Sequence, residues 1–154
     1  MKLWLLRHGE AESAARTDAE RNLTAHGRRQ VREAAGLLQG RPLQAVLVSP
    51  YVRAQQTADV LCEVLGFSGS RVTVPWLTPD SDLRQTLREL DGYALQELLL
   101  VTHQPLVGTL AGLLLHGHRQ QPLAMNTASL ALLEGDALLA GLMTLSAHKH
   151  PAPI

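Results

Sequence analysis

The chain has 154 residues, a length that fits one domain with a substantial core and is short for two. Its 14 Lys and Arg residues balance 14 Asp and Glu residues, so the formal net charge is zero. Because nucleic-acid binders normally carry a basic excess, this balance argues against one, and any anion must bind at a local site. The single cysteine, Cys62, excludes an internal disulfide and favours a reducing, cytoplasmic setting. No apolar run approaches the length of a membrane span or a signal-peptide core.

The first half of the chain alternates predicted strands and helices. Residues 2–6 and 45–48 are continuous apolar runs, which indicate strands that are buried on both faces. Thr24 is expected to cap a helix that ends near Gly40, because apolar residues then recur at helical spacing: Val31, Ala34, Ala35 and Leu38. Ser49-Pro50 is expected to cap a second helix that ends at Gly66, with a buried stripe of Val60, Leu61, Val64 and Leu65.

The second half continues the alternation and then ends in strands. Residues 72–74 and 98–102 predict strands, and residues 82–90 predict a helix between them. Pro105 is expected to open a further helix, in which Gly108 and Gly112 would allow close packing on the sheet. Residues 129–134 and 138–145 flank Gly135-Asp136 and predict a hairpin. The segment from about 146 to 154 is expected to be a frayed tail.

Strands that alternate with helices imply a largely parallel sheet with helices on both faces. The sequence therefore predicts a single three-layer α/β/α domain over residues 1–154. In such sheets a ligand lies beyond the carboxyl ends of the strands, so the residues that follow each strand deserve inspection.

Cationic and imidazole side chains follow three of the predicted strands. The first strand ends in Arg7-His8-Gly9, and the second runs into Ser49-Pro50-Tyr51-Val52-Arg53, with Thr57 one helical turn later. The fourth strand ends in Thr102-His103-Gln104-Pro105. Because parallel strands end at one edge of a sheet, two arginines and two histidines are expected to converge there.

This set suits the transfer of a phosphoryl group. A neutral imidazole is a good nucleophile toward phosphorus, and nearby guanidinium groups lower its pKa and so keep it neutral. Arginine forks fit phosphoryl oxygens with paired hydrogen bonds, and helix N-termini after Ser49 and His103 would add backbone donors. Gly9 would let the backbone turn sharply beside the ligand. Positioning and charge stabilisation carry most of such a reaction, so no metal or other cofactor is expected.

The same residues resemble the histidine phosphatase superfamily, also called phosphoglycerate-mutase-like, and most closely its short SixA-type phosphohistidine phosphatase branch. The resemblance rests on RHGEA, D-x-x-R-x-L-T-x-x-G from Asp18 to Gly27, LVSPYVRAQQT and VTHQPLVG. It extends from Met1 to about Leu145 and implies a phosphoglycerate-mutase-like fold and a metal-independent phosphatase.

The resemblance implies a role for each matching residue. His8 would be the phosphorylated nucleophile, and Arg7, Arg53 and His103 would complete the phosphate pocket. Arg21 would line the substrate entrance, and Gly9 and Ser49 would lie against the substrate. Related mutases and many monoester phosphatases carry a dedicated acid in a larger insertion, whereas this region is short here. The candidate proton donors are therefore Asp18, Asp80, Asp82 and Glu10.

The short insertion favours one substrate class over another. Expelling a sugar oxygen needs a general acid, whereas phosphohistidine has a weaker P–N bond and a leaving imidazole. The sequence therefore predicts removal of phosphate from a phosphohistidine on a signalling protein, such as a phosphotransfer domain. The alternatives are a small-molecule phosphomonoester phosphatase, a binding module without turnover and, less favoured, a mutase. The oligomeric state stays open.

Several other features have simple structural interpretations. The histidine pairs His116/His118 and His148/His150 lack clustered acids or cysteines and are weak metal candidates. Cys62 lies in an apolar helical stripe and is expected in the core. Asp18 and Arg21 either pair with each other or line the site, and Thr127 and Ser129 either adjoin the pocket or begin a strand.

Overall fold

A six-stranded sheet with the order β3-β2-β4-β1-β5-β6 forms the centre of the computed structural model, which describes residues 1–93 and 97–152. The strands are β1 (Lys2–Arg7), β2 (Ala45–Val48), β3 (Ser70–Thr73), β4 (Glu97–Thr102), β5 (Leu130–Glu134) and β6 (Thr144–Lys149). The first four are mutually parallel, whereas β5 is antiparallel to β1 and β6 is antiparallel to β5. The predicted largely parallel sheet is confirmed.

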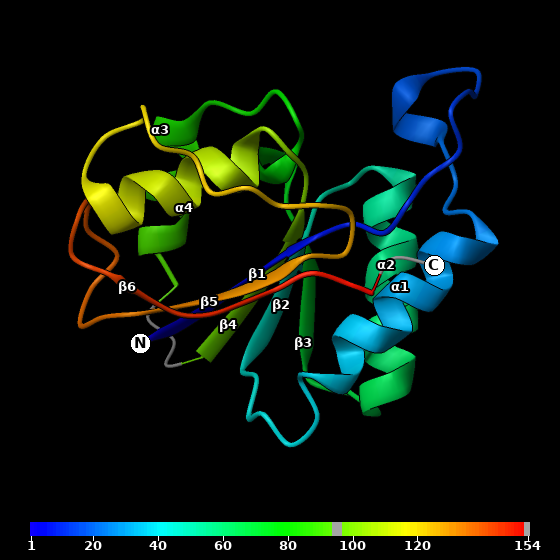
Figure 1. Ribbon diagram of the computed structural model, residues 1–154, viewed down its shortest axis with the longest axis horizontal. Helices are drawn as coiled ribbons and strands as arrows, with labels where there is room; N and C mark the ends of the chain where they lie inside the picture. The colour runs from blue at the N-terminus through cyan, green and yellow to red at the C-terminus, as the bar shows by residue number, and fades with distance from the viewer. Residues whose placement is uncertain (94–96, 153–154) are drawn as a thin grey trace.

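Helices cover both faces of this sheet. The helices α1 (Ala25–Gly36) and α2 (Val52–Leu65) lie on one face, and α3 (Leu83–Asp91) and α4 (Leu106–His116) lie on the other (Figure 1). Two short 3-10 helices, η1 (Asp18–Glu20) and η2 (Pro75–Leu77), lie in the connections. The three-layer prediction is therefore confirmed. Within the described ranges, no helix has the length and apolar character needed to cross a membrane.

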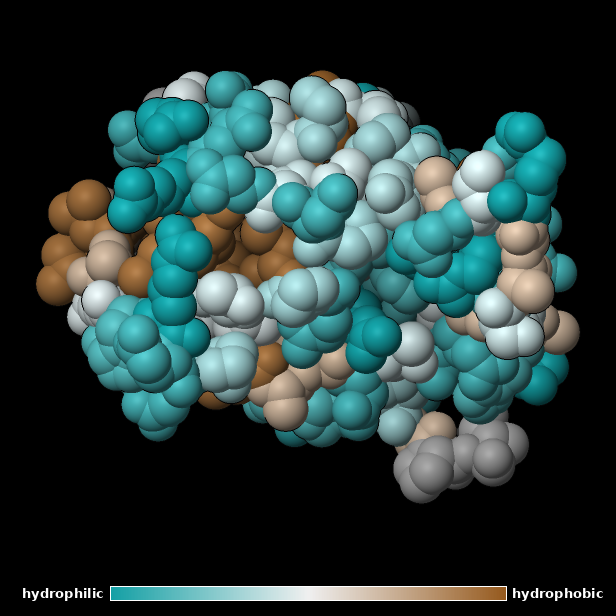
Figure 2. All heavy atoms as spheres, turned by 90° about the horizontal axis from the view of Figure 1, so that it is seen from above, coloured by the Kyte–Doolittle hydropathy of each residue, from teal (hydrophilic) through white to brown (hydrophobic). Residues whose placement is uncertain are grey.

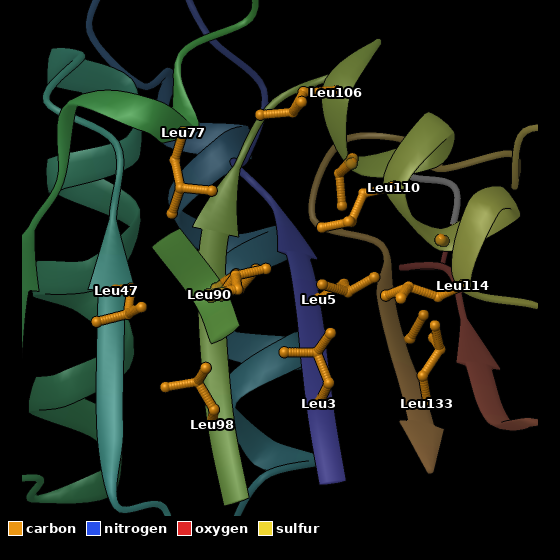
Figure 3. Packing of buried hydrophobic residues seen from close by; sticks show 14 of the residues in the cluster. Leu3, Leu5, Leu47, Leu77, Leu90, Leu98, Leu106, Leu110, Leu114 and Leu133 are labelled. Atoms are coloured by element: carbon orange, nitrogen blue, oxygen red, sulfur yellow. The ribbon is translucent and has the colours of Figure 1, made fainter. Parts of the chain in front are cut away.

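Alternate strand residues supply two separate cores. Leu3 and Leu5 of β1 point to the side of α3 and α4, where they pack with Leu110 and Leu114 (Figure 3). Trp4 and Leu6 belong to the opposite core beneath α1 and α2. Because successive side chains of a strand point to opposite faces, a strand that is covered on both sides must be apolar throughout. This explains the continuous apolar runs in the sequence.

The helix boundaries agree with the sequence except at two ends. Thr24 caps α1 as predicted, since its hydroxyl accepts a hydrogen bond from the Gly27 amide at 2.9 Å. The helix ends at Gly36 rather than near Gly40. The predicted Ser49-Pro50 cap is wrong, because α2 begins at Val52 and the Ser49 hydroxyl serves the site described below.

The glycines of α4 pack on a loop and not on the sheet. A Cβ at Gly108 would lie 2.5 Å from the Leu123 carbonyl, and one at Gly112 would overlap the Gln121 carbonyl. The two glycines do allow a close approach, as predicted, but the segment that approaches them is the loop of residues 121–123 and not the sheet.

The C-terminal segment also differs from its prediction. The hairpin forms, but its second strand is Thr144–Lys149, and residues 146–149 are therefore paired with β5 and not frayed. His150 continues this order by pairing its Nδ1 with the Ser129 hydroxyl at 2.5 Å. The end of the predicted tail, residues 153–154, lies outside the described residues.

Candidate active site

Four predicted site residues meet at the carboxyl edge of the parallel strands. His8 follows β1, Arg53 lies in the first turn of α2, and His103 follows β4. The two imidazole centroids are 4.9 Å apart, and the Arg53 Nε donates a hydrogen bond to His8 Nε2 at 3.2 Å. All three side chains are buried, with residue exposures of 6% for His8, 3% for Arg53 and 1% for His103. Arg7 completes the group from the last position of β1.

Hydrogen bonding fixes which His8 nitrogen carries the proton. Nδ1 lies 2.7 Å from the Gly9 carbonyl oxygen, and a carbonyl can only accept, so Nδ1 is the donor. In the neutral ring the lone pair is therefore on Nε2, the nitrogen that faces Arg53. His8 is arranged as a neutral base whose free electron pair points toward cationic groups.

The surroundings hold His8 in this neutral form. Desolvation by burial is the main cause that lowers its pKa to about 4, and the positive charges of Arg53, Arg7 and Arg21 act in the same direction. The hydrogen bond to Gly9 opposes them. The sequence analysis expected the arginines to lower this pKa, and burial proves to be the larger cause. Burial, followed by the neighbouring charges, lowers the pKa of His103 to about 2.

Gly9 supports His8 through its backbone. Its amide donates to the Thr57 hydroxyl at 3.1 Å while its carbonyl accepts from His8. A Cβ at this position would lie 2.6 Å from the Gly27 carbonyl, so the close approach of α1 requires glycine. The expected reason was wrong, because Gly9 is not among the glycines with positive φ. The structure places Gly9 behind the imidazole, where it orients the ring.

Ser49 contacts His103. The buried Ser49 Oγ lies 2.7 Å from His103 Nε2 and accepts a hydrogen bond from the Tyr51 amide at 3.2 Å. When the hydroxyl donates to Nε2, the proton of the neutral His103 ring is on Nδ1. The Tyr51 ring lies 5.1 Å from the His103 ring and 5.1 Å from the Arg53 guanidinium. Tyr51 thus bridges both residues, a contact that the sequence analysis missed.

Asp18 binds the two arginines that flank the site. The Arg53 guanidinium donates to the Asp18 carboxylate at 3.1 Å and to its carbonyl at 2.7 Å, and Arg21 donates to the same carboxylate at 3.0 Å. Although desolvation raises the pKa of Asp18, these hydrogen bonds and charges lower it overall. The pairing with Arg21 and the position at the site rim therefore occur together, and Asp18 is a carboxylate rather than a ready proton donor.

Of the other candidate donors, Asp80 and Glu10 have partners elsewhere. Asp80 accepts a hydrogen bond from the Thr78 hydroxyl at 2.9 Å, and Asp82 precedes the first turn of α3. The Glu10 carboxylate accepts from the Thr24 hydroxyl at 2.8 Å. In residues 1–93 and 97–152, no hydrogen bond or ion pair joins any of these carboxylates to His8.

Arg7 links the buried centre to an open groove. Its NH1 donates to the Met125 carbonyl at 2.9 Å. The groove has a volume of about 530 Å³, and it is lined by Arg7, Gln104, Pro105, Thr109 and residues 122–126. Figure 2 views the molecule from the side to which the parallel strands point, where a mostly hydrophilic surface surrounds an apolar area toward α4. A ligand in this groove would reach the phosphate pocket past Arg7.

Two buried nitrogens at the site have no hydrogen-bond partner in the described residues, namely Arg7 Nε and His103 Nδ1. Buried polar groups normally find partners, and both nitrogens belong to residues beside His8. Phosphoryl oxygens would satisfy both nitrogens. Within the part of the chain that is described, no three His, Cys, Asp or Glu side chains gather in a way that could hold a metal ion. The arrangement therefore fits a tetrahedral oxyanion beside a neutral imidazole.

Comparison with known proteins gives the same class. Residues 3–76 match the model of the histidine phosphatase superfamily (branch 1). The chain is 33% identical over 136 residues to the phosphohistidine phosphatase SixA of Escherichia coli strain K12, which covers 85% of this chain and 83% of that protein. It is 31% identical over 148 residues to the SixA homolog of Haemophilus influenzae, which covers 88% of this chain and 89% of the relative.

A solved structure agrees with these relatives. The structure of the protein histidine phosphatase SixA complexed with tungstate superposes with a TM-score of 0.87 at 31% identity, over 98% of this chain and 97% of the other. The chain belongs to the histidine phosphatase superfamily. The predicted family, fold and phosphatase class are confirmed.

Proposed function

We propose that this protein is a phosphohistidine phosphatase, which removes the phosphoryl group from a histidine of a signalling protein through a covalent phospho-His8 intermediate. The observation that carries the proposal is the state of His8, which is neutral, held by Gly9 at Nδ1 and has its lone pair on Nε2 beside Arg53. A phospho-ligand binding module would need the arginines but not this nucleophile. The names of the SixA relatives support the same substrate class.

In the first step His8 takes the phosphoryl group. The Nε2 lone pair forms a new P–N bond while the P–N bond of the substrate breaks. The substrate ring is protonated on its other nitrogen, so it takes the electron pair of the broken bond and leaves as a neutral imidazole. Arg7, Arg53 and His103 donate hydrogen bonds to the phosphoryl oxygens and stabilise the developing charge. In the free enzyme the Arg53 Nε–H donates a hydrogen bond to His8 Nε2. When substrate binds, this N–H donates to a phosphoryl oxygen instead.

In the second step water releases the phosphate. A water oxygen attacks phosphorus, the bond from phosphorus to Nε2 breaks, and the electron pair returns to Nε2. The water proton leaves with inorganic phosphate, so the neutral His8 is regenerated and the atoms balance. Throughout both steps the Gly9 carbonyl keeps the proton on Nδ1.

The positions of the carboxylates support phosphohistidine over a monoester. Asp18 is bound by two arginines and its pKa is lowered, while Asp80 is hydrogen-bonded to Thr78 and Asp82 lies at the start of α3. A leaving imidazole needs less help from an acid than a leaving alkoxide does. The groove beside Arg7 is open, which suits the surface of a protein that presents a phosphorylated side chain.

The test compares substrates and variants. Wild type, His8→Ala and His8→Asn are incubated with a phosphotransfer domain that carries phosphohistidine, and in parallel with a panel of phosphomonoesters. The His8→Asn amide can still donate to the Gly9 carbonyl but has no Nε2, so this variant separates the nucleophile from the fold. We expect wild type to dephosphorylate phosphohistidine faster than any of the phosphomonoesters. Both His8 variants should show no turnover and form no phosphoenzyme that can be trapped.

Other outcomes identify the alternatives. Faster turnover of a metabolite monoester would keep the His8 chemistry and overturn the substrate. Binding of the phosphoprotein without turnover or phosphoenzyme would indicate a binding module and would overturn the proposal entirely.

A further inference from the structure

We propose that His148 of the C-terminal strand is a positioning residue for Arg7, and that it acts through the segment of residues 124–129, here named the Arg7 support segment. This inference rests on the proposed function, because it concerns how the phosphate pocket is held in shape. It also gives a role to a part of the chain for which the sequence predicted none.

The Arg7 support segment holds the first two residues of the site at three points. The Met125 carbonyl accepts from Arg7 NH1 at 2.9 Å, and the Ser129 carbonyl accepts from the Arg7 amide at 3.1 Å. The Ala128 amide donates to the His8 carbonyl at 2.9 Å. A shift of this segment would therefore move the Arg7 guanidinium directly.

The segment adopts a conformation that needs outside support. Ala128 has a φ of 57°, in the left-handed region that costs a non-glycine residue energy and persists only when neighbouring contacts impose it. Met125 and Ala128 are 3% and 2% exposed, so the segment is pressed against the core on one side. The remaining question is what holds its other side.

The last strand supplies that support. His148 Nε2 lies 2.8 Å from the Ala124 carbonyl, and because the carbonyl can only accept, the imidazole donates. His150 Nδ1 pairs with the Ser129 hydroxyl. His148 in β6 and His150 just after it therefore hydrogen-bond to the two ends of the segment. Their rings are in contact at a centroid distance of 4.6 Å. In Figure 1 β6 lies along the outer edge of the sheet beside β5, which follows the segment directly.

The chain of contacts is therefore short. The carbonyl that His148 holds and the carbonyl that holds Arg7 belong to adjacent residues, Ala124 and Met125. Without the hydrogen bond from His148, Ala124 and the adjacent Met125 carbonyl would be less well ordered. The Arg7 guanidinium would then be correctly oriented toward phosphate for a smaller fraction of the time. The substrate would bind more weakly and react more slowly, although His148 touches neither.

The experiment measures phosphate binding apart from turnover. Binding of inorganic phosphate to the full chain is measured by calorimetry for wild type, His148→Ala, His148→Leu and His148→Gln, each checked by thermal unfolding. Removing one hydrogen bond of this kind is expected to weaken phosphate binding about 3-fold to 10-fold. The Gln amide can reach the Ala124 carbonyl as Nε2 does, so His148→Gln should recover most of the affinity. The matched control is His118→Ala, at an exposed histidine just after α4, which should bind like wild type.

A double-mutant cycle separates positioning from general stability. In the Arg7→Ala background, His148→Ala should change phosphate affinity by less than about 2-fold, because the group it positions is gone. Equal losses in both backgrounds, or a His148→Gln variant as weak as His148→Leu, would overturn the inference. Since phosphate binding does not require turnover, failure of the phosphohistidine assay would count against the proposed function and leave this test intact.

Discussion

His8 is expected to remain a neutral nucleophile at pH 5, where an ordinary histidine is mostly protonated. Burial, aided by the charges of Arg53, Arg7 and Arg21, lowers its pKa from 6.5 to about 4. At pH 5 a group with a pKa near 4 is about 90% neutral, whereas one with the ordinary pKa is about 3% neutral. The difference in reactive nucleophile is therefore about 30-fold. The lower limb of the rate profile should fall near pH 4 and not near pH 6.5.

Two measurements check this value. The first is an NMR titration of the imidazoles in histidine-labelled protein, with His8→Asn used to assign the resonance. The second is the rate of phosphoenzyme formation across pH 4 to 8, followed with a phosphomonoester because phosphohistidine is labile in acid. A His8 resonance that titrates near 6.5 in the folded protein would refute the reasoning.

A charge-removing variant separates the causes of the low pKa. Arg21→Gln takes away one of the positive charges that act on His8, while the burial of the ring stays. Because burial is the largest cause, the pKa should rise only part of the way toward 6.5. A complete return to the ordinary value would show that charge, and not burial, controls the nucleophile.

Four further variants have distinct expected results. Arg53→Ala should lower kcat/KM on phosphohistidine by about 100-fold to 1,000-fold, which is the loss typical of a transition-state donor. Asp82→Ala should change kcat/KM little. Equal, severe losses in both variants would identify Asp82 as the acid. Thr57→Val should leave the Gly9 amide without its acceptor and lower the free energy of unfolding, measured in urea, by about 1–3 kcal/mol. Gly27→Ala should also destabilise the protein in urea, by about 1–3 kcal/mol, because its Cβ would overlap the Glu10 carbonyl; a gain would show that helix propensity prevails.

Local pattern was sufficient for most of the fold. Residues 45–48 could be assigned because a strand between two helical layers has no polar face, and the structure has β2 at these residues. Thr24 could be assigned as a cap because capping depends on the next few residues alone. The C-terminal strand could not be assigned, because residues 144–149 contain no continuous apolar run and are largely exposed, and pairing with β5 is what orders them. Ser49 failed as a helix cap for a related reason, since its hydroxyl binds His103, which is distant in sequence.

In the candidate site, too, one part was predictable from the sequence and another was not. The convergence of Arg7, His8, Arg53 and His103 followed from parallel topology, which brings strand ends to one edge whatever the loops do. The partners of these residues did not follow from it. The contact of Arg53 with Asp18 and that of Arg7 with Met125 join segments far apart in the chain, and both use a backbone carbonyl, which no residue type reveals.

One physical condition connects the reactivity of this site with the stability of the fold. His8 and His103 are buried neutral, with pKa values below those of an unfolded chain, so unfolding takes up protons below pH 6.5. Above pH 6.5 the two neutral rings do not reduce the free energy of unfolding. As the pH falls from 6.5 toward 4, the unfolded chain gains protons that the buried rings do not, so the free energy of unfolding decreases. The burial that keeps the His8 ring neutral, as the proposed chemistry requires, is the same burial that makes the domain sensitive to acid. A more exposed His8 would relieve that sensitivity and would be protonated at the pH where the buried ring still reacts.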